Sequence, residues 1–166
     1  MGALHDNLVC TVAIGIVATA FMDAAAIVRR RVAGTPLPDY ALVGRWIAWM
    51  PRGRFRHAAI ARSPSMRGER ALGWIAHYAT GVGYAGVLLA FVGLEWVRDP
   101  TVLPALAVGI GSVLVPFLLM QPGMGAGIAG SRTADPARMR MRSLVTHAVF
   151  GVGLYVGAWM VRLVAP

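Results

Sequence analysis

The chain has 166 residues, which predicts a single domain over 1–166; only 14% of the residues are charged and 57% are hydrophobic. A water-facing surface needs about a quarter charged residues, so this composition excludes an ordinary soluble domain and predicts one that is covered by a lipid bilayer. The net charge is +9, and all of the 16 basic residues behind it are arginines. Because the arginines cluster between apolar runs, they indicate membrane-flanking loops and no nucleic-acid partner.

Four apolar segments are long enough to cross a bilayer as helices, which takes about 20 residues. They are residues 8–28, 71–94, 101–120 and 144–164. Helices are expected because every backbone polar group has to be paired inside lipid. The sequence therefore predicts an all-α integral membrane protein, a bundle of four transmembrane helices.

The arginines between these segments predict the orientation of the chain. Ten of them lie in the loop 29–70 and four in the loop 121–143, whereas the loop between the second and third spans has only Arg98 against Glu95 and Asp99. Basic loops stay on the cytoplasmic side of the membrane. Both of the basic loops are therefore expected in the cytoplasm, and both termini outside (N-out/C-out).

The first cytoplasmic loop contains an apolar stretch at 39–50, DYALVGRWIAWM, that is too short to cross a bilayer. It predicts an interfacial or re-entrant helix, with Trp46 and Trp49 at the depth of the lipid headgroups. The next stretch, 51–64, interleaves arginines with apolar residues. Its place beside a membrane favours attraction to anionic lipids over nucleic-acid binding.

One polar side chain lies within or at the end of each predicted span: Asp23, His77, Gln121 and His147. At about 1.5 Å per residue, each lies roughly 20–30 Å from the outer end of its span, so all four are expected at one depth near the cytoplasmic side. Ionisable residues within spans face the bundle interior and mark function. The second and fourth helices of an ordered bundle are diagonal, and we expect these four side chains to form one ligand-binding or proton-relay site.

A glycine follows each of the two histidines by four residues, Gly81 after His77 and Gly151 after His147, on the same helix face. Tyr84 and Tyr155 lie near those faces. Two interpretations stay open. The glycines can leave a slot for a flat cofactor such as haem b, ligated by both histidines, or they can let helices pack closely, which is common in membranes.

A metal ion is a second candidate ligand of the same site. Neutral imidazole is a common ligand for zinc, copper and iron. The thioether of Met124 is expected at the level of His77 and His147, and imidazole with thioether suits copper. The sequence therefore leaves a copper or zinc ion open beside haem.

The third span ends in a run of glycines, FLLMQPGMGAGIAGSRTADP. Pro122 lacks a backbone donor and ends or kinks the helix, and the glycines after it permit an irregular backbone that approaches other segments closely. The run is either a plain helix end with a loop or a re-entrant backbone that lines a site. Asp135 and Pro136 are expected to cap and begin the last helix.

Four stretches together resemble a bacterial inner-membrane family that is known only as domain of unknown function 2938: GIVATAFMD, GWIAHYATGVGYA, MQPGMGAGIAGSRT and HAVFGVGLY. The resemblance covers nearly the whole chain. It implies a multi-pass protein of the bacterial inner (plasma) membrane with four spans, and it supplies no established activity.

Three functions are compatible with these residues. The polar site can bind a metal, haem or a small polar ligand, or it can take part in transport or proton relay, for which a homodimer would supply eight spans. Alternatively, the chain is a non-catalytic accessory or structural subunit of a larger membrane complex. The polar layer would then only fix the register of the helices.

An enzyme stays open, but no motif in the sequence supports one. The sequence contains no nucleophile elbow, no HExxH motif and no nucleotide fingerprint. Ser112, Thr19 and Thr80 have no evident base partner, and hydroxyls in membrane helices usually bond their own backbone.

Overall fold

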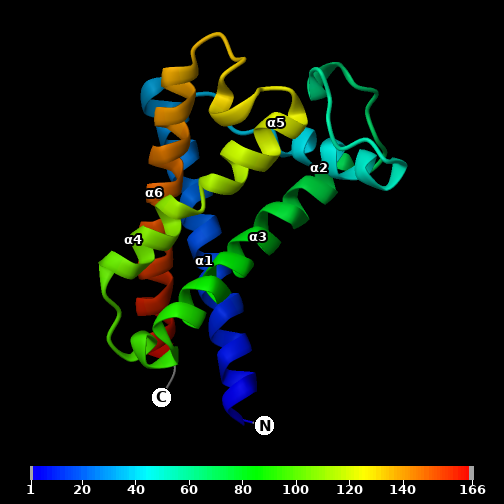
Figure 1. Cartoon of the computed structure of the whole chain (residues 1–166). Helices are drawn as coiled ribbons and strands as arrows, with labels where there is room; N and C mark the ends of the chain where they lie inside the picture. The colour runs from blue at the N-terminus through cyan, green and yellow to red at the C-terminus, as the bar shows by residue number, and fades with distance from the viewer. Residues whose placement is uncertain (1, 165–166) are drawn as a thin grey trace. The chain divides into compact units, whose positions relative to one another are not determined.

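A computed structural model describes the backbone of residues 2–164 and the side chains of residues 7–164 (Figure 1). Within this range every regular element is helical. The α-helices are α1 (Gly2–Ala33), α2 (Tyr40–Trp49), α3 (Glu69–Val92), α4 (Val102–Gly111), α5 (Gln121–Met124) and α6 (Pro136–Val164). Shorter helical turns are η1 (Met50–Arg52), η2 (Ile60–Arg62), η3 (Leu94–Arg98), η4 (Pro116–Met120) and η5 (Ile128–Gly130).

Four helical stretches in the described range are long and apolar enough to cross a membrane. They are Asn7–Ala33, Glu69–Val92, Val102–Met124 and Pro136–Val164. The prediction of an all-α fold with four membrane-spanning helices is thereby confirmed. The membrane orientation and the single domain over 1–166 stay predictions.

The last helix begins earlier than its apolar residues do. The predicted span starts at residue 144, whereas α6 starts at Pro136. Asp135 accepts a hydrogen bond from the backbone N–H of Arg138 at its Oδ1 (3.0 Å), which satisfies a donor of the first turn. The predicted cap is confirmed, and it starts the helix eight residues before the apolar run.

The chain forms two compact units. The first unit holds residues up to 37, residues 78–112 and residues from 145 onward. The second unit holds residues 38–77 and 113–144.

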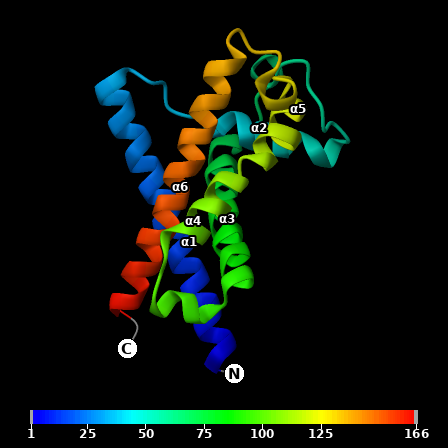
Figure 2. The ribbon, with the colours of Figure 1, turned by 60° about the vertical axis from the view of Figure 1, so that its left-hand side comes forward.

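The core of the first unit is built by α1, α3, η3, α4 and α6. Its buried residues are Ile14, Ala18, Ala85, Leu88, Leu89, Trp96, Val97, Ala105, Phe150, Leu154 and Ala158. Helix α6 lies beside α1 and α4 (Figures 1 and 2). A Cβ atom at Gly153 would stand 2.8 Å from the carbonyl oxygen of Ala18, and one at Gly109 would meet the backbone of Gly151. Glycine therefore sets the close spacing of these helices.

The third span is not one regular helix, in contrast to the prediction for 101–120. Helix α4 ends at Gly111, residues 112 and 113 form a turn, and η4 has the wider i→i+5 pattern of a π-helix. In a regular helix the Ser112 carbonyl would accept from the N–H of residue 116, but Pro116 has no N–H. The Tyr84 hydroxyl donates to that carbonyl instead (3.4 Å). Pro116 therefore accounts for the irregularity.

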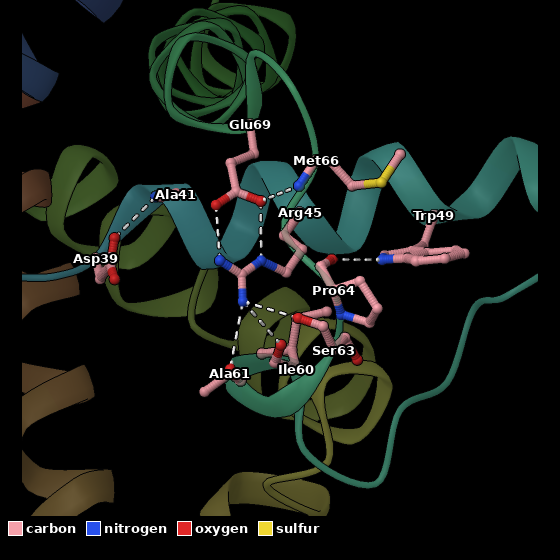
Figure 3. A network of polar contacts seen from close by, with 10 residues as sticks. All are labelled: Asp39, Ala41, Arg45, Trp49, Ile60, Ala61, Ser63, Pro64, Met66 and Glu69. Carbon is pink, nitrogen blue, oxygen red and sulfur yellow. Dashed lines mark hydrogen bonds and ion pairs between the residues drawn. The ribbon is translucent and has the colours of Figure 1, made fainter.

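The second unit is organised around Arg45 of α2 (Figure 3). Its Nε and Nη2 donate to the two carboxylate oxygens of Glu69 at 2.8 and 2.7 Å. Its Nη1 donates to the carbonyl oxygens of Ile60, Ala61 and Ser63 at 3.4, 3.3 and 3.1 Å. The hydrogen bonds to the Glu69 carboxylate raise the pKa of the Arg45 guanidinium above its usual value. One arginine thus joins α2, the loop between α2 and α3, and the start of α3.

The short apolar stretch at 39–50 forms a helix, α2, as predicted, and Asp39 caps it by accepting from the N–H of Ala41 (3.0 Å). The predicted headgroup depth of Trp46 and Trp49 stays a prediction. The Trp46 side chain is only 8% exposed, and its Nε1 donates to the carbonyl oxygen of Phe55 (2.9 Å). This hydrogen bond joins α2 to the loop between α2 and α3. The interfacial or re-entrant placement of α2 stays a prediction.

Candidate functional site

A half-buried histidine and a buried serine form a polar pair in the first unit. The Ser112 hydroxyl oxygen lies 2.6 Å from Nδ1 of His147 and 2.6 Å from the carbonyl oxygen of Gly109. A hydroxyl has one proton, so when Ser112 donates to Gly109, the N–H at Nδ1 of His147 donates to Ser112. Nε2 of the neutral ring is then left as an acceptor. Ser112 therefore has an imidazole partner that the sequence did not indicate, whereas Thr19 bonds the Gly15 carbonyl as expected.

The first unit has a cavity of about 460 Å³ between α3 and α4. Its lining is almost entirely apolar. The lining includes Tyr84, Val87 and Phe91 of α3, Ala107, Val108 and Gly111 of α4, and Ser112. An apolar cavity with a few polar groups at one place is the usual form of a small-molecule site. Ser112 and Tyr84 supply the polar groups of the lining, and the Ser112 hydroxyl contacts the ring of His147.

Asp23 also lies in the first unit, where Tyr78 of α3 donates its hydroxyl to Oδ2 (3.2 Å). Asp23 and His147 therefore each have a partner on a neighbouring element, Tyr78 and Ser112 respectively. Such hydrogen bonds between helices hold their register in a membrane.

His77 and Gln121 belong to the second unit. The His77 ring stacks on that of Tyr40, with centroids 4.1 Å apart. Gln121 is 6% exposed; its Nε2 donates to the sulfur of Met139 (3.6 Å), and its buried Oε1 has no hydrogen-bond partner among the described residues. Because the four predicted polar residues are shared between two units, a single site made of all four stays a prediction.

Neighbouring helices fill the space beside the two glycines of the predicted cofactor slot. A Cβ atom at Gly81 would meet the hydroxyl of Thr19 in α1, and one at Gly151 would stand 2.9 Å from the Ala105 carbonyl oxygen in α4. This arrangement favours close helix packing, one of the two interpretations of these glycines. Of the two tyrosines, Tyr84 bonds Ser112, and Tyr155 packs edge-on against Trp159 with centroids 6.4 Å apart.

The described residues offer no ready metal cluster. Among the side chains of residues 7–164, no group of three or more His, Cys, Asp or Glu could hold an ion. Met124, the predicted thioether ligand, ends α5 in the second unit with His77, whereas His147 is in the first. A site of His77, His147 and Met124 therefore stays a prediction.

A family model described as "Protein of unknown function (DUF2938)" matches residues 12–161. The chain belongs to this family. The match includes the cavity between α3 and α4 and both members of the Ser112–His147 pair. No curated protein and no solved structure matches the chain. The family description names no activity.

Two residues of these sites were missed in the sequence. Ser112 looked like an ordinary hydroxyl in a span, and Arg45 looked like one of many loop arginines. The available signal for Ser112 was Pro116, four residues on, which frees its carbonyl. For Arg45 the signal was its position within the apolar stretch of α2, where an arginine needs a partner.

Proposed function

We propose that the chain is a multi-pass inner-membrane protein that binds an amphiphilic membrane molecule. The apolar part of that molecule lies in the cavity between α3 and α4, and its polar group lies at the Ser112–His147 pair. One observation carries the proposal: a cavity of about 460 Å³ with an apolar lining includes Ser112, whose hydroxyl is 2.6 Å from an imidazole nitrogen. A lipid has both an apolar part and a polar group, and lipids are abundant around a membrane protein.

The proposed orientation keeps the arginine-rich loops in the cytoplasm, where they also attract anionic lipids. His147 belongs to the predicted polar layer and joins the proposed lipid site through Ser112, which lines the cavity. Asp23, His77 and Gln121 would extend that layer toward a small polar ligand, a transported ion or a proton relay. The orphaned Oε1 of Gln121 supports a donor group in this layer.

The substitution Gly111→Leu should abolish lipid retention. Gly111 lines the cavity, and a Cβ atom there would meet nothing within 4 Å, so a leucine fits into the cavity without disturbing the helices. It replaces about three buried methylene groups of a ligand, each worth about 0.8 kcal/mol, which predicts a loss of affinity of at least about tenfold. The measurement is the mass of the protein released from detergent after thorough delipidation.

Gly83→Leu is the matched control, because Gly83 in α3 also has open space around it and does not line the cavity. Wild type and Gly83→Leu should each keep about one lipid per chain under conditions that strip bulk lipid. Loss of lipid from both variants to the same degree, or a wild type that keeps none, would reject the proposal.

An accessory subunit is the second candidate, and the local partners of the polar residues favour it. Asp23 bonds Tyr78, His147 contacts Ser112, and His77 stacks on Tyr40. Hydrogen bonds and ring contacts of this kind fix helix register without any ligand. A stoichiometric membrane partner that still co-purifies with the double variant His77→Ala/His147→Ala would support this role; a chain that stays alone or forms only homodimers would not.

A further inference from the structure

The loop between α2 and α3, in the second unit, lines a small cavity of about 280 Å³. Its lining includes Arg54, His57, Arg62, Ser63 and Pro64, all within eleven consecutive residues. The cavity is slightly smaller than the usual range for drug-sized ligands, about 300–1,000 Å³. It therefore suits a compact group.

His57 is the buried polar member of this lining, with a side chain only 7% exposed. Its Nδ1 lies 2.8 Å from the Ser63 hydroxyl oxygen, and its Nε2 is buried without a hydrogen-bond partner in the described part of the chain. When Ser63 donates its proton to Nδ1, Nε2 carries the ring proton and is a donor. An unmet buried donor is unfavourable, so an acceptor atom at Nε2 would stabilise the loop.

The excess of arginines over carboxylates around the cavity favours an anionic ligand. The second unit contains eleven arginines and three carboxylates, Asp39, Glu69 and Asp135. All three carboxylates are engaged at the starts of α2, α3 and α6, and none of them is among the residues that line the cavity. Arg54 and Arg62 therefore face no competing carboxylate in the lining.

The loop is held in place before any ligand binds. Arg45 holds the carbonyl groups of Ile60, Ala61 and Ser63, as Figure 3 shows, and Trp49 donates from Nε1 to the carbonyl oxygen of Pro64 (3.3 Å). The Arg54 guanidinium lies 4.8 Å from the centre of the Trp49 ring. A site that is ordered in advance loses less entropy on binding.

We propose that this cavity binds a phosphate group, with Arg54 and Arg62 supplying the charge and His57 a hydrogen bond. The planar guanidinium matches two phosphate oxygens at once, which explains arginine at both positions. The phosphate is either that of a phospholipid headgroup or a free phosphate. This site is separate from the proposed lipid cavity of the first unit, and it goes beyond general attraction to anionic lipid because it depends on two particular arginines.

The test is calorimetric titration of the whole protein in neutral detergent at constant ionic strength. One arm adds inorganic phosphate and the other adds micellar phosphatidylglycerol. We expect saturable binding in at least one arm. Arg54→Gln/Arg62→Gln should weaken it about tenfold or more, because each contact is a hydrogen bond between charged groups. His57→Phe, which keeps a ring but removes both nitrogens, should also weaken it.

Arg56→Gln/Arg67→Gln is the matched control, since it removes the same charge from the same loop at residues that do not line the cavity. It should change the affinity by less than about threefold. Binding in the phosphate arm would show that inorganic phosphate alone is sufficient for binding. Binding only in the lipid arm would show that the site binds the phosphate of a phospholipid headgroup. Equal weakening in both double variants, or no saturable binding in either arm, overturns the proposal.

Discussion

Arg45→Ala is expected to lower the free energy of unfolding by about 3 kcal/mol, because it leaves a mostly buried carboxylate without its cationic partner and three carbonyl groups without their arginine donor. The side chains of Arg45 and Glu69 are 14% and 15% exposed, and their closest atoms are 2.7 Å apart. Surface ion pairs contribute far less, usually under about 1 kcal/mol. The difference here is that one guanidinium joins three segments of the second unit.

The measurement is chemical unfolding in mixed micelles, followed by helical circular dichroism. Arg67→Ala is the control: this arginine is exposed in the same loop, and its removal should change stability by less than about 0.5 kcal/mol. A double-mutant cycle with Glu69→Ala should give a coupling energy of about 2 kcal/mol. Equal effects of Arg45→Ala and Arg67→Ala would mean that the network contributes nothing beyond its charge.

Gly109→Ala is expected to cost about 2–3 kcal/mol, since its new methyl group would meet the backbone of Gly151, which cannot rotate away. The two glycines allow α4 and α6 to touch. The Gly109 carbonyl also accepts from Ser112, so separating the helices should weaken the Ser112–His147 contact as well. Stability and lipid retention should therefore fall together in this variant.

Gly111→Ala, two residues further along, provides the comparison. A Cβ atom there would meet nothing within 4 Å, and replacing glycine by alanine in a helix stabilises it by up to about 1 kcal/mol. Unfolding of both variants in mixed micelles should place Gly109→Ala below wild type and Gly111→Ala at or above it. Two variants of equal stability would contradict the close α4–α6 packing.

The helices could be predicted because their signals are local. A run of about 20 apolar residues is sufficient for a membrane helix, and Asp135 before Pro136 is sufficient for a helix start. The apolar stretch at 39–50 likewise gave α2. Each of these features depends on neighbours in the chain, which one sequence contains in full.

The side-chain pairs could not be predicted in the same way, because they join distant residues. Ser112 and His147 are 35 residues apart, and Arg45 and Glu69 are 24 apart. Polar residues at equal depth can face one another or can each bond a nearby helix, and depth alone does not distinguish these outcomes. Asp23 bonded to Tyr78 and His77 stacked on Tyr40 are examples of the second kind.

The glycines illustrate the same limit. Gly81 and Gly151 each follow a histidine by one turn, which is equally suited to a cofactor slot and to a close helix crossing. Only the opposing atoms decide, and those are Thr19 for one glycine and Ala105 for the other. The irregular turn after α4 depends on Pro116, whose effect falls on the carbonyl four residues earlier.

Photo-crosslinking from inside the cavity tests the proposed lipid site most directly. A photoreactive residue would replace Ala107, which lines the cavity, or Ile110, which lies on the same helix, is 42% exposed and does not line it. Both positions are exposed on α4, so the comparison isolates the cavity. We expect adducts at 107 to be enriched in one lipid species and to disappear in Gly111→Leu, whereas adducts at 110 follow the bulk composition. Adducts of the same composition at both positions, unchanged by Gly111→Leu, would contradict a specific site.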